Sequence, residues 1–275
     1  VFGFVLGPLS VALAGVPAGR PVIERWADMM ASGTFIIGPL WFAWALLIFA
    51  LAWVAWASLR GHRTGTAAST NDELPSWPTW LLAALGVGAA ALLIRQWVPV
   101  GESVFGLQLG YFASYVFLFA LGCRAAAGRW LERVSAQQAR GWGIVSLLAV
   151  PCLFVAAAMA GALEGKPVNF NGGLGPTAIV YAFWEPLVAW GIIASLLYMF
   201  RTRFNGPSER WSRWSSNAYG AFIVHAPILV GLSVLAAGWQ GPALLKFLVI
   251  AAASTVVSFW IAGGLRKLPG ATRVL

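Results

Sequence analysis

The sequence is a series of long apolar runs separated by short polar stretches. Seven of these runs are long enough to cross a hydrocarbon core of roughly 30 Å as helices that rise about 1.5 Å per residue. They lie at residues 37–59, 77–98, 107–127, 143–163, 176–200, 217–238 and 243–264. The pattern predicts an all-α fold, a polytopic transmembrane helix bundle.

Two shorter segments precede the first predicted span. Residues 1–15 are apolar but short for a crossing, so we expect a partial helix there. Residues 17–36 mix charged and apolar positions, which is typical of an interfacial helix on the outer face of a membrane. Because the sequence begins at Val1 without an initiator methionine, we interpret residues 1–275 as one domain truncated at its N-terminus.

The composition supports a membrane protein. Hydrophobic residues make up 60% of the chain and charged residues 10%, and the mean hydropathy is +0.78, values outside the usual range of soluble domains. We interpret the 16 tryptophans mainly as anchors at the membrane interfaces. Cys123 and Cys152 fall within predicted spans without the spacing of a metal site or a disulfide framework, so neither is expected.

The distribution of positive charge predicts the topology. A net charge of +9 suggests nucleic-acid binding, but the basic residues are concentrated in alternate connections. The first set of loops and ends holds Arg60, Arg63, Arg124, Arg129, Arg133, Arg140, Arg201, Arg203, Arg210, Arg213, Arg266, Lys267 and Arg273. The second set holds Arg20, Arg25 and Lys166. The positive-inside rule places the first set and the C-terminus in the cytoplasm, and no nucleic-acid partner is expected.

Glu185 and His225 are the candidate catalytic residues. Glu185 lies about nine residues into its span from the outer side, and His225 about eight residues into the next span from the inner side, so their depths differ by a few ångströms. Ionisable groups at such depth are costly and mark functional sites by default. The two side chains would line one midplane cavity, or form a structural hydrogen bond between two helices. Trp41, Tyr181 and Tyr219 are candidates for the wall of this substrate cavity, with core packing as the alternative.

Four arginines near the ends of spans are further candidates. Arg95 is close to the outer end of its span, where it either extends to the lipid headgroups or holds an anionic intermediate or acceptor. Arg124, Arg201 and Arg203 lie at inner ends, where they would bind the phosphates of a cytoplasmic donor such as acyl-CoA. The topology alone also explains these three residues.

Four passages, taken in order, resemble the integral-membrane acyltransferase 3 family. They are 38–47 (GPLWFAWALL), 98–101 (VPVG) with 119–122 (FALG), 183–185 (FWE) leading to 200–205 (FRTRFN), and 218–225 (AYGAFIVH). Members of this family typically have ten helices and a cytoplasmic N-terminus, so the resemblance implies that three helices precede this sequence. The family's catalytic arginine and histidine lie in its first helix and are not matched here, so we expect this sequence alone to be inactive.

The resemblance implies a multi-pass enzyme of the bacterial inner membrane that acts in polysaccharide modification. It would transfer an acyl group, often acetyl, from acyl-CoA to a hydroxyl of an extracytoplasmic or membrane-associated glycan. Acyl-CoA is the donor substrate, and no bound cofactor is implied. Glu185 would then orient the general base, and Arg95 would stabilise oxyanion charge. Two alternatives stay open: a proton-coupled transporter or flippase that uses Glu185 and His225 as a relay, and a structural or regulatory membrane subunit.

Overall fold

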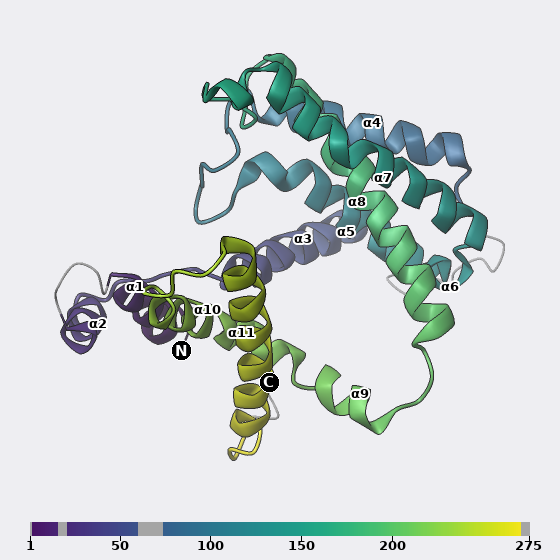
Figure 1. Ribbon diagram of the computed structural model, residues 1–275. Helices are drawn as coiled ribbons and strands as arrows, with labels where there is room; N and C mark the ends of the chain where they lie inside the picture. Colours follow the sequence, from purple (N-terminus) through teal and green to yellow (C-terminus); the bar gives the residue numbers. More distant parts are fainter. Residues whose placement is uncertain (1, 16–20, 60–73, 271–275) are drawn as a thin grey trace. The chain divides into compact units, whose positions relative to one another are not determined.

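The computed structural model describes residues 2–15, 21–59 and 74–270. Helices account for most of this part of the chain (Figure 1), and its one extended pairing is an isolated bridge between Val104 and Leu107. The prediction of an all-α fold is confirmed. Four basic residues used to predict the topology lie outside the described residues: Arg20, Arg60, Arg63 and Arg273.

Seven helices in the described part of the chain are long and apolar enough to cross a membrane. They are α3 (Leu40–Leu59), α4 (Trp77–Ile94), α5 (Phe112–Ala127), α7 (Ala136–Met159), α8 (Pro176–Arg203), α10 (Ala218–Leu235) and α11 (Ala243–Leu265). A 3-10 turn, Leu109–Tyr111, extends α5 at its start. The number and order of the spans agree with the prediction.

One boundary differs clearly from its prediction. The fourth span was expected to begin at residue 143, whereas α7 begins at Ala136. Ser135 and Gln138 form a capping box: the Ser135 hydroxyl accepts from the Gln138 amide at 3.1 Å, and the Gln138 side chain accepts from the Ser135 amide at 3.1 Å. The box satisfies backbone donors that would otherwise lack partners, so the helix begins in a polar turn that an apolar pattern does not detect.

The described residues form two compact units. The first unit contains Val1–Leu47 and Pro207–Leu275, and the second contains Ile48–Gly206. The boundary between them falls within α3, so that helix contributes residues to both.

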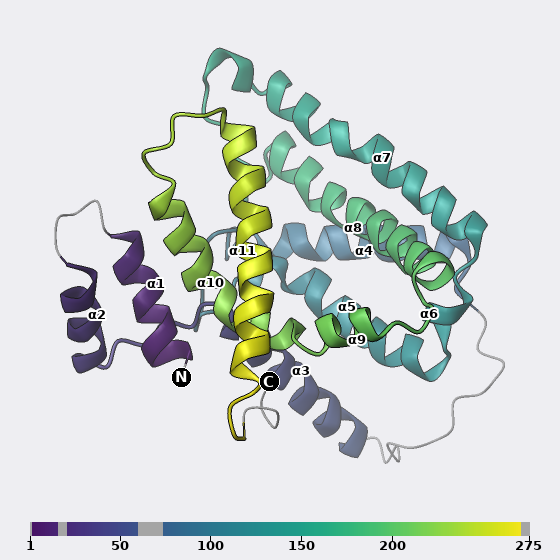
Figure 2. The same cartoon turned by 60° about the horizontal axis from the view of Figure 1, so that its bottom comes forward.

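In the first unit, α10 packs against α11, and α1 (Gly7–Ala14) packs against α10 (Figure 2). A π-helical turn, Phe2–Leu6, precedes α1. The neighbouring helix α2 (Val22–Ala31) packs on α1. Its Trp26 indole donates a hydrogen bond of 2.9 Å to the Val5 carbonyl, which attaches the polar segment to the apolar one.

The second unit is built around α7 and α8, which lie side by side (Figure 1). They approach so closely that a Cβ at Gly191 would lie 2.2 Å from the Cβ of Ser146. The Ser146 hydroxyl donates to the Val188 carbonyl at 3.1 Å, and the Trp184 indole donates to the Ala149 carbonyl at 2.8 Å. Small residues and interhelical hydrogen bonds are the usual means by which membrane helices associate.

Two further helices pack in this unit, α4 against α8 and α5 against α4. The buried core consists of Ala84, Val87, Trp142 and Trp190. Trp142 and Trp190 are only 4% and 8% exposed, so these two are core residues rather than the interface anchors predicted for most tryptophans. The single turn α6 (Trp130–Arg133) follows α5 and packs on it.

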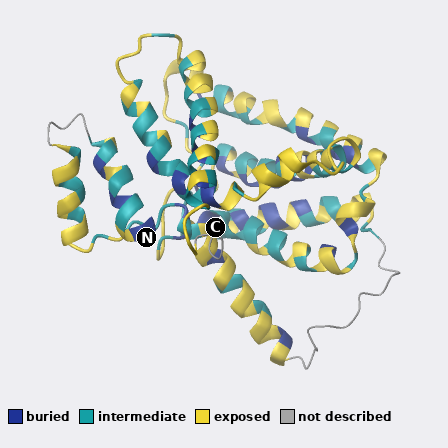
Figure 3. Cartoon of the chain, turned by 90° about the horizontal axis from the view of Figure 1, so that it is seen from below, coloured by how far each residue is buried: buried dark blue, intermediate teal, exposed yellow. Residues whose placement is uncertain are grey.

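The long helices carry many exposed residues along their length (Figure 3). Many of these are large and apolar, among them Leu147, Phe154 and Trp260, which are 72%, 69% and 80% exposed. Such a surface is unfavourable in water and suits contact with lipid.

The two ends of the second unit differ in charge. Where α5 and α8 end and α7 begins, which we call the basic end, the chain carries Arg124, Arg129, Arg133, Arg140, Arg201 and Arg203. At the opposite end, α4 and α7 terminate and α5 and α8 begin. The candidate site lies near this opposite end.

Candidate functional site

Arg95 is the central residue of the candidate site. It follows the last residue of α4, Ile94, and its side chain is 1% exposed. The alternative that Arg95 extends to lipid headgroups is therefore wrong, because the guanidinium turns into the protein. A buried arginine in a membrane helix bundle is costly unless other groups compensate its charge.

Residues of α5, of the 3-10 turn that precedes it and of α8 supply this compensation. Arg95 Nε donates to the Gly110 carbonyl at 2.9 Å, just before α5. Arg95 Nη2 forms an ion pair with the carboxylate of Glu185 in α8. The other Glu185 oxygen accepts from the Ser114 hydroxyl of α5 at 2.9 Å. The side chain of Glu185 is 18% exposed, so the pair is largely shielded from water.

Two tyrosine rings flank the guanidinium. Its carbon lies 4.9 Å from the ring centroid of Tyr181 and 5.5 Å from that of Tyr111. The two phenol oxygens are 3.5 Å apart. Both distances to the rings are within the range of cation–π attraction, which grows as water is excluded. Tyr181, predicted as a cavity residue, thus takes part in the site.

One donor of Arg95 remains unused. Its Nη1 is buried and has no hydrogen-bond partner among the described residues. A buried donor without a partner costs about 1–3 kcal/mol. Such a group is usually satisfied by water or by a ligand, so Nη1 marks a position where an oxygen atom would be stabilised.

The loop between α7 and α8 packs against Arg95. A Cβ at Gly172 would lie 2.5 Å from the Arg95 carbonyl oxygen, so the close approach requires glycine. The Asn171 carbonyl accepts from the Val100 amide at 2.8 Å, and the Gly173 carbonyl accepts from the Gln96 side chain at 3.1 Å. These contacts hold the loop over the end of α4.

His225, the second predicted catalytic residue, lies in α10 of the first unit. Its Nδ1 is 2.6 Å from the Phe222 carbonyl oxygen. Because a carbonyl only accepts, Nδ1 must carry the hydrogen, which leaves Nε2 as the basic nitrogen of the neutral ring. Glu185 belongs to the second unit, so the predicted contact between Glu185 and His225 stays a prediction.

The two remaining aromatic candidates also belong to the first unit. The Trp41 ring lies 5.9 Å from that of Phe42, in an edge-to-face arrangement. Phe42 in turn packs against Phe222 of α10, with 6.3 Å between ring centroids. Tyr219 is 49% exposed. The prediction that Trp41 and Tyr219 line a substrate cavity therefore stays a prediction.

The predicted donor-binding arginines lie at the basic end. Arg201 donates to the backbone carbonyls of Leu131, Glu132 and Val134, the last at 2.6 Å. It therefore holds the turn that leaves α6. Arg124 and Arg203 are exposed, and their prediction as donor-binding residues is unaltered.

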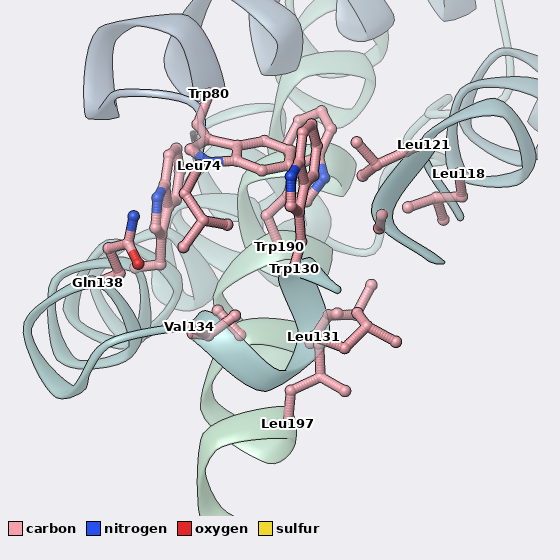
Figure 4. Close-up of a pocket in the computed structure, with 14 residues that line it drawn as sticks. Leu74, Trp80, Leu118, Leu121, Trp130, Leu131, Val134, Gln138, Trp190 and Leu197 are labelled. Carbon is pink, nitrogen blue, oxygen red and sulfur yellow. The ribbon is translucent and has the colours of Figure 1, made fainter. Parts of the chain in front are cut away.

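An apolar cavity of about 110 Å³ lies in the half of the second unit nearest the basic end. It is lined by Leu74, Trp80, Leu118, Leu121, Ala125, Trp130, Leu131, Val134, Gln138, Trp142, Trp190, Ile193, Ala194 and Leu197. None of these lining residues is charged. The rings of Trp80 and Trp130 meet edge to face with 6.4 Å between their centroids, and Trp190 also lines the cavity (Figure 4). The indole N–H groups of Trp130 and Trp190 are buried without a hydrogen-bond partner among the described residues.

Sequence reasoning did not identify several parts of this site. Ser114, Tyr111 and the Gly110 carbonyl were not candidates, although a polar residue inside an apolar span was a signal that could have indicated Ser114. In the amino-acid sequence, the large number of tryptophans was the only feature that could have indicated the apolar cavity. Among the described residues, no three His, Cys, Asp or Glu side chains gather as metal ligands would.

The arrangement defines a multi-pass membrane protein with a buried, charge-compensated arginine near one end of its helices. The sequence profile described as an acyltransferase domain, that of the acyltransferase 3 family, matches residues 2–263. The match covers nearly the entire chain, which therefore belongs to this family. A search of curated proteins and of solved structures finds no match. Family membership favours an acyltransferase over the transporter alternative.

Proposed function

We propose that the protein transfers an acyl group, in the simplest case acetyl, from cytoplasmic acyl-CoA to a hydroxyl of an extracytoplasmic or membrane-associated glycan. The observation that carries the proposal is the buried Arg95 guanidinium with Nη1 unpaired. Acyl transfer to a hydroxyl passes through a tetrahedral intermediate whose oxygen becomes negative. A fixed cationic donor in a site shielded from water is suited to stabilise that charge.

The neighbours of Arg95 are consistent with this role. Nε is held by the Gly110 carbonyl and Nη2 by the Glu185 carboxylate, so the guanidinium plane is fixed before a substrate binds. Preorganised donors stabilise a transition state without a reorganisation cost during the reaction. Glu185 accepts from both Arg95 and Ser114. In this proposal it is a positioning residue for Arg95 rather than the general base.

His225 is the candidate for proton transfer within this sequence. Its Nδ1 hydrogen is directed to the Phe222 carbonyl, so Nε2 can accept a proton from a hydroxyl. The family resemblance also implies a catalytic histidine that is not matched in this sequence. Activity measurements on the His225→Ala variant separate the two sources of the base.

The orientation follows from the distribution of arginines. With the basic end of the second unit in the cytoplasm, as the positive-inside rule implies, the Arg95 site faces the extracytoplasmic side and the C-terminus is cytoplasmic. In a bacterium this membrane is the inner membrane. The acceptor glycan then reaches Arg95 without crossing the bilayer.

The apolar cavity suits the acyl part of the donor. Its wall offers no charge to a CoA phosphate, but the N–H groups of Trp130 and Trp190 are available to a carbonyl oxygen. The phosphates would instead contact exposed arginines at the basic end, Arg124 and Arg203. Trp190 lies five residues after Glu185 in α8, an axial rise of roughly 7.5 Å, so a short transfer path separates cavity and site.

The test uses membranes that contain the native gene product. Radiolabelled acetyl-CoA is added, and label is followed into extracytoplasmic glycan for wild type, Arg95→Gln and His225→Ala. We expect Arg95→Gln to lower kcat per folded protein by about 100-fold, the usual loss for an oxyanion donor. The amount of folded protein is measured alongside, because the variant also leaves the Glu185 charge without its partner. Glu164→Gln is the control, because that exposed carboxylate pairs with Lys166 away from the Arg95 cluster. Full activity of Arg95→Gln would contradict the proposal.

A further inference from the structure

A second, chemically different pocket lies in the first unit. It has a volume of about 740 Å³ and is formed where α9 (Glu209–Ser215), the start of α10 and the end of α11 meet. This volume is within the roughly 300–1,000 Å³ typical of small-molecule sites. None of its lining residues belongs to the Arg95 site, so it needs a separate explanation.

The charge of this pocket has one sign. Arg213, Arg266 and Lys267 contribute to its lining, and none of the lining residues is acidic. Glu209 lies one turn before Arg213 in α9, but it lines a neighbouring hollow instead. Three cations around one concave surface create a local potential that concentrates anions.

Arg266 is fixed in this wall. Its Nη1 donates to the Asn217 side-chain oxygen at 3.1 Å, so it connects the end of α11 to the start of α10. Its Nε is buried and has no hydrogen-bond partner among the described residues. A Cβ at Gly263 would lie 3.0 Å from the Asn217 side-chain nitrogen, so glycine there leaves space for the contact. The guanidinium is thus preorganised rather than a mobile surface charge.

Aromatic rings adjoin the cations. Trp214 and Phe259 pack with 5.1 Å between their ring centroids, and both line the pocket. A ligand that satisfies this surface needs a negative group for the arginines and an apolar or planar part for the rings. The N–H groups of arginine match two oxygens of a carboxylate or a phosphate at once. A phosphate monoester carries nearly two negative charges, so it matches a group of three cations better than a carboxylate does.

We propose that this pocket binds a phosphate ester, with Arg213, Arg266 and Lys267 on the phosphate and Trp214 against the remainder of the ligand. The inference does not depend on acyl transfer. The same chemistry is presented by an anionic lipid headgroup and by a soluble phosphate ester. Two arms of one experiment separate these sources.

The full-length protein is reconstituted in phosphatidylcholine nanodiscs and titrated with adenosine 3′,5′-bisphosphate, a soluble planar phosphate ester. In the second arm, nanodiscs also contain phosphatidylglycerol, and the lipid retained by the protein is counted by native mass spectrometry. Saturable binding in the first arm supports a soluble ligand. Selective retention of phosphatidylglycerol in the second supports a lipid headgroup.

Substitutions in the pocket test whether it is the site of the observed phosphate-ester or lipid binding. We expect Arg213→Gln and Lys267→Gln each to weaken binding about tenfold, the usual effect of losing one charged contact. Arg210→Gln, in the same helix but outside the pocket lining, should leave binding unchanged. Arg266→Gln also removes the Asn217 contact, so its melting temperature is measured as well. Absence of binding in both arms would overturn the proposal, as would an equal loss in Arg210→Gln.

Discussion

Arg95 donates to the carboxylate of Glu185, a residue 90 positions further along the chain, and the guanidinium is almost completely buried. The pair joins the end of α4 to the middle of α8, and Ser114 of α5 completes it. Because three helices meet at this pair, the same contacts that orient Arg95 for a substrate also contribute to the packing of the bundle. Experiments on either residue must therefore measure stability and activity together.

Glu185→Gln should destabilise the protein. The substitution leaves the Arg95 charge buried without its counter-charge, and breaking one side of a buried pair typically costs about 3–5 kcal/mol. The measurement is the free energy of unfolding of the purified protein in detergent. Glu164→Gln, at an exposed ion pair, should change it by less than about 1 kcal/mol. A similarly small effect of Glu185→Gln would contradict a buried pair.

The double variant Arg95→Met, Glu185→Leu separates the two roles of the pair. Replacing both charges by apolar side chains removes the unpaired charge, so stability should recover relative to Glu185→Gln. Acyl transfer should not recover, because the donor at Nη1 is absent. If both stability and acyl transfer recovered, the Arg95–Glu185 pair would have a structural role only.

The sequence predicted the helices well because apolar length reports directly on membrane crossing. All seven predicted spans are present, and the predicted boundaries differ from the observed ones only at the helix ends. At the start of α7, a polar capping box at Ser135 rather than hydropathy determines the first helical residue. Arg95, Glu185 and Tyr181 were separate candidate residues in the sequence, and their catalytic or binding roles stay predictions. Their mutual contact was not predicted, since spacing along a chain does not specify which helices become neighbours.

Other features depend on packing that no local pattern records. The Gly110 carbonyl is a backbone group, so its residue type carries no indication that it accepts from Arg95. Arg201 looks in sequence like Arg203, two positions later in the same basic loop. Only the fold shows that Arg201 is committed to the carbonyls that follow α6.

Gly191→Ala should destabilise the second unit. The new Cβ would lie 2.2 Å from Ser146 Cβ and 2.3 Å from the Trp142 carbonyl oxygen, so α7 and α8 must separate. Overpacking of this kind costs about 1–3 kcal/mol. Gly86→Ala is the matched control, because its Cβ meets nothing within 4 Å and alanine favours a helix. Thermal unfolding should therefore show a loss for the first variant and no loss for the second.

Gly172→Ala should lower acyl transfer more than it lowers stability. A Cβ there overlaps the Arg95 carbonyl oxygen at 2.5 Å, so the loop must move away from the end of α4. The contacts between α7 and α8, such as Ser146 with Val188, do not involve this loop, so the helices remain packed. Gly175→Ala, with nothing within 4 Å of its Cβ, is the control in the same loop. Equal activity of the two variants would show that the loop position does not influence the site.

Trp190→Phe tests the apolar cavity. The change removes one N–H donor and leaves a smaller aromatic ring in the core, so the free energy of unfolding should fall by about 1–3 kcal/mol, as expected for a large-to-small substitution that keeps a ring in place. If the indole N–H binds the donor carbonyl, KM for acetyl-CoA should rise several-fold while KM for the glycan is unchanged. Ile193→Val, which removes one methyl group from the same lining, is the control for packing. An unchanged KM for acetyl-CoA would exclude Trp190 as a contact of the acyl group.

Arg201→Gln distinguishes a structural arginine from a donor-binding one. The guanidinium donates to three carbonyls between Leu131 and Val134, so its loss should expose this turn. Amide hydrogen exchange should become faster over residues 130–138, because the turn loses the contacts that hold it against α8. Arg203→Gln, on an exposed side chain in the same helix, should leave this exchange unchanged. If Arg201→Gln instead raised KM for acetyl-CoA without altering exchange, Arg201 would be a residue that binds the donor, and its contacts with the turn would be incidental.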